Sequence, residues 1–201
     1  MPYIIVGLGN PGAEYENTRH NVGRIVLEAI RKEFAKGDEG EFKFNKKINA
    51  QVAEGKVWKE KVQFIAPETF MNNSGKSVGS LVKSAKAAEH LIIIYDDFNL
   101  PLGRMKISFN RSSGGHNGLE SIIKAVKTEG FVRFRIGTAP EKANGDAKVP
   151  HGDDKVLKFI LGPLKDDEIK ELKKVSKKAI EAVEMLIKES REKAMSVYNA
   201  G

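Results

Sequence analysis

Cysteine is absent from the 201 residues of this chain. The protein can therefore form no disulfide and no thiolate zinc site, and it has no thiolate nucleophile. Also missing is an apolar run of the ~18 residues that a membrane-spanning helix requires. The residues before Gly7 lack the basic region and the cleavage site of a secretory signal. We expect a soluble protein that is not exported and that works in the reducing cytoplasm.

Acidic residues are too few to balance the basic ones, because 27 Asp and Glu stand against 34 Lys and Arg, a formal net charge of +7. A positive surface attracts polyanions such as nucleic acid, although a solvated lysine-rich surface without such a partner fits this charge equally well. Hydrophobic residues make up 40% of the chain, enough for one packed core, so a disordered protein is excluded. We expect a single domain over residues 1–201.

Strand and helix patterns alternate along the chain. Strands are predicted at Tyr3–Val6, Gln51–Glu54, Val62–Ala66, Leu91–Tyr95, Met105–Phe109 and Phe131–Ile136, and helices after Asn21, Gly75, Gly118 and Pro163. This alternation predicts an α/β fold class, as a single layered domain with a mixed, mostly parallel central sheet flanked by helices.

Three segments complete this prediction. Residues 37–47 are charged and contain glycines, which indicates a loop. The polar stretch 138–155 is longer than an ordinary connection and predicts either a functional flap or a mobile loop. Residues 165–199 form a C-terminal helical segment whose lysine-rich face is typical of a solvated surface.

Two short motifs resemble known ligand-binding loops but lack their context. Gly7–Gly12 fits the G-x-G-x-x-G pattern of dinucleotide sites, yet no helix is predicted to begin at its last glycine. Gly75–Gly79 fits the G-x-S-x-G elbow of serine hydrolases, with Ser77 at its centre. No strand leads directly into Ser77, which favours a structural serine in a first helical turn. A serine esterase that uses Ser77 is the minor alternative.

Two of the four histidines, His20 and His116, lie in loops rich in glycine and asparagine. A single loop histidine is most often a hydrogen-bonded surface residue, but such loops also bring ligand-binding donors together. An imidazole with an unperturbed pKa near ~6.5 can take a proton from water at neutral pH. Asp96 ends the most buried strand and is placed to orient such a ring. Hydrolysis by histidine-activated water is the direct scheme for this residue set.

Three asparagines, Asn10, Asn72 and Asn117, fall in loops of the same kind. Each amide offers one acceptor and two donors in a plane, which suits it to hold a peptide group or a polarised carbonyl. An asparagine in a turn is ordinarily turn chemistry, so each one alone indicates little. Several such loops together favour a ligand site.

The motifs occur together in one known family. The blocks are Gly7–Gly12 with Tyr15, Thr18–Gly23, Phe70–Gly75, Tyr95–Asp97, Leu100–Gly103, Gly114–Leu119 and Arg135–Gly137. In this order, over nearly the whole chain, they resemble bacterial peptidyl-tRNA hydrolase. The resemblance implies a monomeric, metal-independent esterase without a cofactor, which cleaves the ester between a nascent peptide and its tRNA. Peptidyl-tRNA is then the partner, and no membrane is involved.

The resemblance also implies roles for single residues. His20 matches the catalytic histidine, and Asp96 matches the acid that orients it. Asn10, Asn72 and Asn117 match the asparagines that hold the peptide main chain and the reacting ester or water. The residues that line the cleft by the same resemblance are Tyr15, Met71 and His116.

The tRNA half of the substrate gives the basic surface a role. Arg135 matches a position that the family uses for tRNA phosphate, a contact that adds affinity without sequence preference. The chain departs from the family before Gly114, where Ser, Phe, Asn, Arg, Ser and Ser at residues 108–113 replace a lysine and a glycine-rich run. We expect Lys106 and Arg111 to take over that contact. Residues 138–155 match the family's mobile lid.

One alternative follows from the same resemblance. This fold is also similar to organellar splicing factors, so the chain could instead be a non-catalytic RNA-binding homologue. The complete set of His20, Asp96 and the three asparagines argues against that alternative. Turnover of peptidyl-tRNA is the observation that separates an enzyme from a binding protein.

Overall fold

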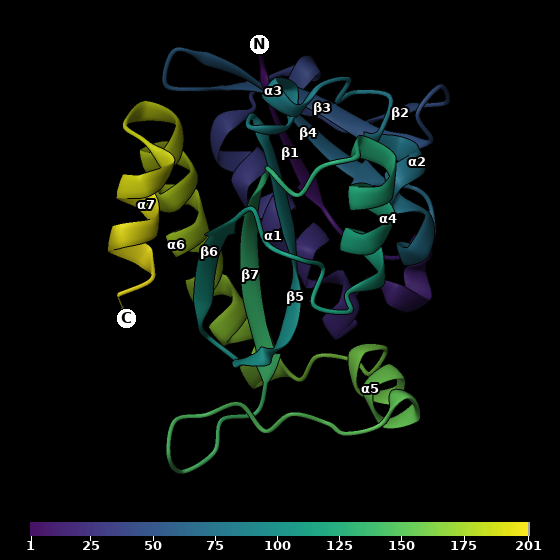
Figure 1. The fold of residues 1–201 in the computed structure, drawn as a ribbon, viewed down its shortest axis with the longest axis vertical. Coiled ribbons are helices and arrows are strands. Elements are labelled where there is room, and N and C mark those ends of the chain that lie inside the picture. Colours follow the sequence, from purple (N-terminus) through teal and green to yellow (C-terminus); the bar gives the residue numbers. More distant parts are fainter. Residues whose placement is uncertain (201) are drawn as a thin grey trace.

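The computed structural model describes residues 1–200, and residue 201, the last of the expected domain, lies outside the described part. Seven strands form one mixed sheet in the order β2-β3-β4-β1-β5-β7-β6 (Figure 1). They are β1 (Tyr3–Gly7), β2 (Lys43–Asn45), β3 (Ala50–Val57), β4 (Glu60–Pro67), β5 (Leu91–Pro101), β6 (Met105–Phe109) and β7 (Val132–Ala139). The central strands β4, β1, β5 and β7 run parallel, and the outer strands pair antiparallel. The predicted fold class is confirmed.

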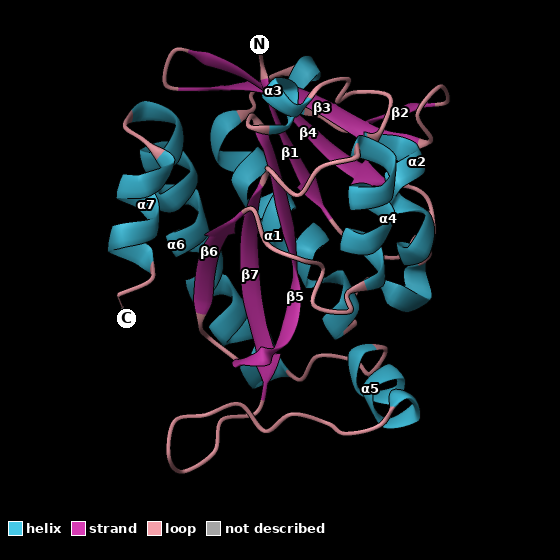
Figure 2. Cartoon of the chain, viewed as in Figure 1, coloured by secondary structure: helices cyan, strands magenta, loops and turns pink. Residues whose placement is uncertain are grey.

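Helices cover both faces of this sheet (Figure 2). They are α1 (Val22–Phe34), α2 (Ser74–Val78), α3 (Ala85–Ala88), α4 (Asn117–Val126), α5 (Asp153–Ile160), α6 (Asp166–Lys188) and α7 (Arg191–Tyr198). Side chains of the central strands alternate between two cores: Ile5 and Ile92 pack with α1 and α6, while Val6 and Ile93 pack with α2 and α4. Within residues 1–200, each helix is too short or too charged to cross a lipid bilayer.

Several elements differ from the sequence-based expectation. The expected loop at 37–47 contains the edge strand β2, whose residues are all exposed, so no apolar alternation marked it. The helix expected after Gly75 ends at Val78, and α3 starts after Ser84, whose side chain accepts from the Ala87 N–H. The Ser84 cap starts α3, so the apolar residues expected in one helix are divided between α2, the turn after it and α3. The expected flap at 138–155 overlaps both β7 and α5, so the segment between elements is 140–152.

The carboxyl ends of the four parallel strands meet at one edge of the sheet, where loops and short helices follow. Helix α4 covers β5 through residues such as Leu119 and Ile122. Among the described residues, the apolar core beneath α4 contains no residue of β6 and no residue of β7 (Val132–Ala139). That face of β6 and β7 therefore stays open beside the loop that leads into α4 (Figure 1).

Candidate active site

The His20 ring and the Asp96 carboxylate are in direct contact. His20 lies in the 3-10 turn η2 (Arg19–Asn21), which leads into α1, and Asp96 follows the apolar run of β5. His20 Nδ1 is 2.9 Å from Asp96 Oδ1 and 3.0 Å from Oδ2. Because an ionised carboxylate only accepts, we assign a proton to Nδ1, which leaves a lone pair on Nε2 of the neutral ring. His20 is thus held in the form that accepts a proton.

Burial and charge act in opposite directions on this pair. His20 is 6% exposed and Asp96 is 2% exposed. Burial lowers the pKa of His20, but the charge of Asp96 and the hydrogen bond to it raise that pKa above its ordinary value. Burial raises the pKa of Asp96, while His20 and His116 lower it by more, so it stays well below its usual range. The carboxylate is ionised at neutral pH and increases the basicity of His20.

His116 shares the same carboxylate but is not arranged as a base. His116 Nε2 lies 3.1 Å from Asp96 Oδ1. His116 is also the N-cap of α4, where its Nδ1 accepts the backbone N–H groups of Gly118 at 3.2 Å and Leu119 at 3.3 Å. Since these groups only donate, we assign the ring proton to Nε2, which donates to Asp96. His116 therefore joins the start of α4 to Asp96.

The same three side chains could hold a metal ion. The ligand atoms of His20, Asp96 and His116 lie within 4.8 Å of one another. Two imidazoles and one carboxylate form a set that zinc binds in other proteins. His20 Nδ1, His116 Nε2 and the Asp96 carboxylate are already paired with one another by hydrogen bonds. The geometry is therefore complete as a hydrogen-bonded triad.

Asn10 is oriented by two neighbouring segments. Its Oδ1 accepts the Met71 backbone N–H at 2.9 Å. Its backbone pairs with the Asn21 side chain, with Asn10 N–H donating to Oδ1 at 2.8 Å and Asn21 Nδ2 donating to the Asn10 carbonyl at 2.9 Å. Because Asn21 follows His20, this pair joins the loop after β1 to the turn η2. With Oδ1 occupied, the Asn10 Nδ2 group is the donor left for a ligand.

Asn72 and Asn117 lie on two elements that pack together. Asn72 belongs to the 3-10 turn η4 (Met71–Asn73), which contacts α4, and Asn117 is the first residue of α4. The contact is close at Gly118, where a Cβ atom would lie 2.5 Å from Met71 Sδ. Met71 is buried, whereas Asn72 and Asn117 are exposed. The buried contact thus carries two amides that face solvent.

An aromatic surface adjoins this group. Tyr15 ends the 3-10 turn η1 (Ala13–Tyr15), and its ring stands edge-on to Phe70 with the centroids 6.3 Å apart. Phe70 directly precedes Met71 and is 56% exposed. An aromatic pair with one exposed and one half-buried ring beside polar donors suits a ligand with an apolar part. The sequence indicated Tyr15 through the family resemblance, but it assigned no role to Phe70.

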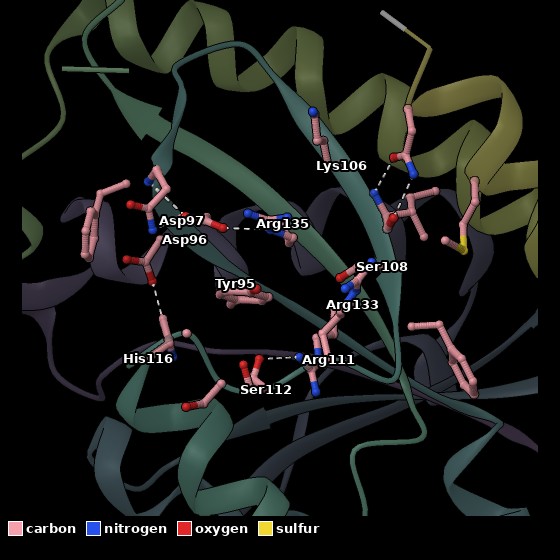
Figure 3. A pocket seen from close by; sticks show the side chains of 18 residues that line it. Tyr95, Asp96, Asp97, Lys106, Ser108, Arg111, Ser112, His116, Arg133 and Arg135 are labelled. Atoms are coloured by element: carbon pink, nitrogen blue, oxygen red, sulfur yellow. Dashed lines mark hydrogen bonds and ion pairs between the residues drawn. The ribbon is translucent and has the colours of Figure 1, made fainter. Parts of the chain in front are cut away.

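A basic cavity opens beside the triad, on the uncovered face of β6 and β7 (Figure 3). Its volume is about 490 Å³. Its charged and histidine lining consists of Asp96, Asp97, Lys106, Arg111, His116, Arg133 and Arg135. Lys106 and Arg135 stand opposite each other in the β6–β7 register. Because like charges at opposite positions repel, this arrangement favours an anionic ligand.

Two further residues shape the cavity. Arg135 Nε donates to Asp97 Oδ2 at 2.7 Å, and Arg133 Nη1 donates to the Ser112 carbonyl at 2.7 Å. No sequence motif indicated a role for Asp97 or Arg133. The period of two along β7 puts Arg133 on the same face as Arg135, and that signal was available in the sequence. The ion pair between Arg135 and Asp97 joins residues 38 positions apart, so no local sequence pattern indicated it.

The structure rules out both misleading motifs. Ser77 is fully buried, and its Oγ donates to the Asn49 carbonyl at 3.1 Å, so the serine-esterase alternative is wrong. The helix that contains Ser77 follows η4 and not a strand, so no elbow forms. The Gly7–Gly12 loop leads into η1, and α1 begins only at Val22, which removes the helix end that a dinucleotide phosphate would need.

Comparison with known proteins gives a consistent result. The family model described as peptidyl-tRNA hydrolase matches residues 4–201. A relative of that name from Aquifex aeolicus is 40% identical over 198 residues, covering 98% of this chain and 95% of the relative. One from Desulfitobacterium hafniense is 36% identical and covers 98% of both chains. The crystal structure of peptidyl-tRNA hydrolase from Acinetobacter baumannii matches with a TM-score of 0.85 at 29% identity, covering 99% of this chain and 95% of that one. The chain belongs to the peptidyl-tRNA hydrolase family.

Proposed function

We propose that this protein hydrolyses the ester bond between a peptide and its tRNA, with His20 as the base that activates water. The observation that carries this proposal is the 2.9 Å hydrogen bond between His20 Nδ1 and Asp96, which leaves Nε2 with a lone pair. The substrate is supported by the family, whose curated members are named for it.

The proposed reaction needs one base and no covalent intermediate. His20 Nε2 takes a proton from water as the water oxygen attacks the ester carbonyl carbon. Asp96 stabilises the imidazolium that forms. When the tetrahedral intermediate collapses, the bond from carbon to the ribose oxygen breaks, and His20 returns the proton to that oxygen. The products are a tRNA with a free hydroxyl and a peptide carboxylic acid, which releases its proton to solvent and becomes a carboxylate. General base help of this kind contributes roughly 10²- to 10⁴-fold.

The asparagines divide between two tasks in this proposal. Asn10 is the donor to the developing oxyanion, because its bond to the Met71 N–H holds Nδ2 in a fixed direction. A preorganised donor of this type contributes ~3 kcal/mol to the transition state. Asn72 and Asn117, both exposed, hold the peptide main chain. Tyr15, Met71 and His116 line the cleft around them. Recognition through the peptide backbone suits an enzyme that accepts many sequences.

The basic cavity beside the triad is the proposed tRNA contact. Arg135, Lys106 and Arg111 line it and would meet phosphate there. Arg133, which no sequence motif indicated, also lines the cavity, but it is almost fully buried and donates to the Ser112 carbonyl. Asp97, through its 2.7 Å bond to Arg135 Nε, fixes the direction of that side chain. The cavity adjoins Asp96, so an anion bound there lies close to the reacting ester.

Three further expectations belong to this proposal. Residues 138–155, which include segment 140–152 and the start of α5, form a lid at the same end of the sheet. The helix α5 buries no residue, which is consistent with a movable element. The protein works as a monomer in the cytoplasm, and it needs neither a metal nor another cofactor.

Hydrolysis of a labelled peptidyl-tRNA tests the proposal. His20→Ala should reduce turnover by at least ~10²-fold, because it removes the base, and should leave tRNA binding close to that of the unsubstituted protein. Ser77→Ala is the matched control and should keep its turnover if it folds, because Ser77 contacts no group of the triad. Binding of the unsubstituted protein without turnover would instead establish the RNA-binding homologue.

Two results would overturn parts of this proposal. Full turnover by a folded His20→Ala variant would remove the histidine mechanism. Loss of turnover after treatment with a chelator, restored by a metal ion, would show that the His20, Asp96 and His116 cluster holds a metal during catalysis.

A further inference from the structure

Helix α5 rests on the turn that carries the catalytic histidine. The helix buries none of its residues, and Figure 1 shows it apart from the main layers, at the carboxyl ends of β5 and β7. Among its contacts is the turn η2, which contains Arg19 and His20. A helix without a buried face is held by individual contacts, so each one at η2 matters for its position.

Arg19 contacts both α5 and the residues that follow it. Its guanidinium carbon lies 4.7 Å from the centroid of the Phe159 ring, near the end of α5. Its backbone N–H donates to the Gly162 carbonyl at 3.2 Å, and Nη1 donates to the Pro163 carbonyl at 3.0 Å. One side chain thus contacts both the last turn of α5 and the connection that follows it.

Glu168 fixes Arg19 from the other side. Both Glu168 carboxylate oxygens lie 2.7 Å from Arg19 Nη2, and both side chains are almost buried. Glu168 also accepts the Lys165 backbone N–H at 2.7 Å, which caps the start of α6. Since α6 packs on α1 in the main core, the guanidinium is anchored to the rigid part of the molecule. Glu168 therefore fixes the position and orientation of the Arg19 guanidinium independently of α5.

The connection after α5 is also paired with the catalytic loop. Leu164 N–H donates to the Asn17 carbonyl at 2.7 Å, and Thr18 forms a bridge with Pro163. Gly162 leaves room for the guanidinium, because a Cβ atom there would lie 3.1 Å from Arg19 Nη1. Backbone contacts therefore join residues 17–19, before His20, to residues 162–164, after α5, and we call this line of contacts the seam.

We propose that Arg19 and Phe159 are positioning residues for the hydrolysis, because their contact sets the place of α5 and the orientation of the His20 turn together. The inference rests on the proposed function, since it concerns the histidine that activates water. A purely structural seam would affect stability alone. A positioning role also affects the rate and the environment of the His20 ring.

The test compares two substitutions on the same helix. Phe159→Ala removes the ring over Arg19 without exposing a charge, and Leu157→Ala is the matched control, since Leu157 is 55% exposed. We expect Phe159→Ala to lower kcat/KM for peptidyl-tRNA by roughly 2- to 30-fold, the range of a cation–π contact. Phe159→Tyr, which keeps the ring, should restore the rate, and Leu157→Ala should match the unsubstituted protein.

Two additional measurements separate positioning from stability. In a double-mutant cycle with Arg19→Met, which removes the cationic group, the loss from Phe159→Ala should largely disappear, because both changes remove the same cation–π contact. An NMR titration of His20, assigned with His20→Gln, should move in Phe159→Ala and not in Leu157→Ala. Additive losses, or an unchanged His20 titration with an unchanged rate, would overturn the inference. Because the titration does not depend on turnover, it remains decisive even if the proposed reaction fails.

Discussion

At the scale of single residues, one carboxylate determines the chemistry of two imidazoles. Asp96 receives Nδ1–H from His20 and Nε2–H from His116, so opposite ring positions face the same acid. The difference comes from the other nitrogen of each ring. In His116 it caps α4, whereas in His20 it is left for a substrate. The two histidines therefore differ in their hydrogen-bond partners, which is why His20, and not His116, is the proposed base.

The pH dependence of the reaction should report the Asp96 charge. The base must be neutral, so kcat/KM rises with pH through the pKa of His20, which Asp96 holds above its ordinary value after burial has lowered it. Asp96→Asn keeps an acceptor for Nδ1–H but removes the charge. Its rising limb should therefore move to lower pH, and its plateau should fall by roughly 10²-fold. Measurement of kcat/KM from acid to neutral pH checks this, and a limb that moves to higher pH would contradict it.

Two substitutions of Asn10 distinguish an effect on turnover from an effect on the stability of the fold. Asn10→Asp retains an acceptor for the Met71 N–H but replaces the Nδ2 donor by an oxygen. Turnover should fall by roughly 10²-fold or more, as for other lost oxyanion donors, while thermal stability stays near that of the unsubstituted protein. Asn10→Ala should in addition lose ~1–3 kcal/mol of stability, because it leaves the buried Met71 N–H without a partner. Equal turnover of Asn10→Asp and the unsubstituted protein would remove Asn10 from the oxyanion role.

How far the sequence predicts such residues depends on the distance between partners. His20, Asp96 and the asparagines were found from residue type, loop composition and the family resemblance. Asn21 and Asp97 stand inside the same motifs, but their roles follow from contacts with Asn10 and Arg135. Those contacts join segments 11 and 38 residues apart. No local pattern encodes a pairing of this kind, so it needs the folded chain.

At the scale of elements, the position of η2 depends on how closely α1 approaches the sheet. Gly23 lies in the first turn of α1, directly behind the catalytic turn. A Cβ atom there would lie 2.6 Å from the Leu8 carbonyl oxygen and would also collide with the Ile94 carbonyl oxygen. Both obstacles are backbone atoms of the loop after β1 and of β5, which cannot rotate away. Glycine at this position lets α1 deliver His20 to Asp96.

Gly23→Ala should therefore destabilise the protein, although alanine is the better helix former. An exposed helical glycine would gain up to ~1 kcal/mol from this change. Here the collision should cost ~1–3 kcal/mol or more and lower Tm by roughly 2–12 °C. Turnover should also fall, since α1 and η2 move away from β5. Glu33→Ala, an exposed change in the same helix, should leave both quantities unchanged. A higher Tm for Gly23→Ala would show that α1 can shift freely.

Sequence patterns predicted strands that are buried on both faces, but they did not predict an exposed edge strand or a helix boundary that a capping residue sets. Leu91–Tyr95 was found because a strand buried on both faces is a continuous apolar run. The edge strand β2 was missed because none of its residues is buried. The expected helix after Gly75 ended at Val78, and a separate helix started after the capping residue Ser84, so its expected apolar residues fall on both sides of the intervening turn. Local hydrogen bonds outweighed periodicity there.

At the scale of the whole molecule, the position of the charge matters more than its sum. The formal net charge of +7 was equally consistent with a solvated surface and with an RNA partner. The fold concentrates Lys106, Arg111, Arg133 and Arg135 around one cavity beside the triad. Sequence spacing could not show this, because the four residues come from two strands and a loop. The sequence analysis expected Arg135 from the family resemblance and Lys106 and Arg111 in place of the family's lysine, and the topology added Arg133.

The salt dependence of tRNA binding tests whether this cavity meets phosphate. Each phosphate contact releases bound counterions, so it adds ~0.7–0.9 to the slope of log K against log salt. Lys106→Ala should weaken tRNA binding and reduce the magnitude of that slope by about one contact, because Lys106 is exposed at the cavity and faces Arg135. Lys56→Ala removes the same charge from the exposed surface of β3 and should leave the slope unchanged. Equal slopes for both variants would mean that net charge, and not the cavity, attracts the tRNA.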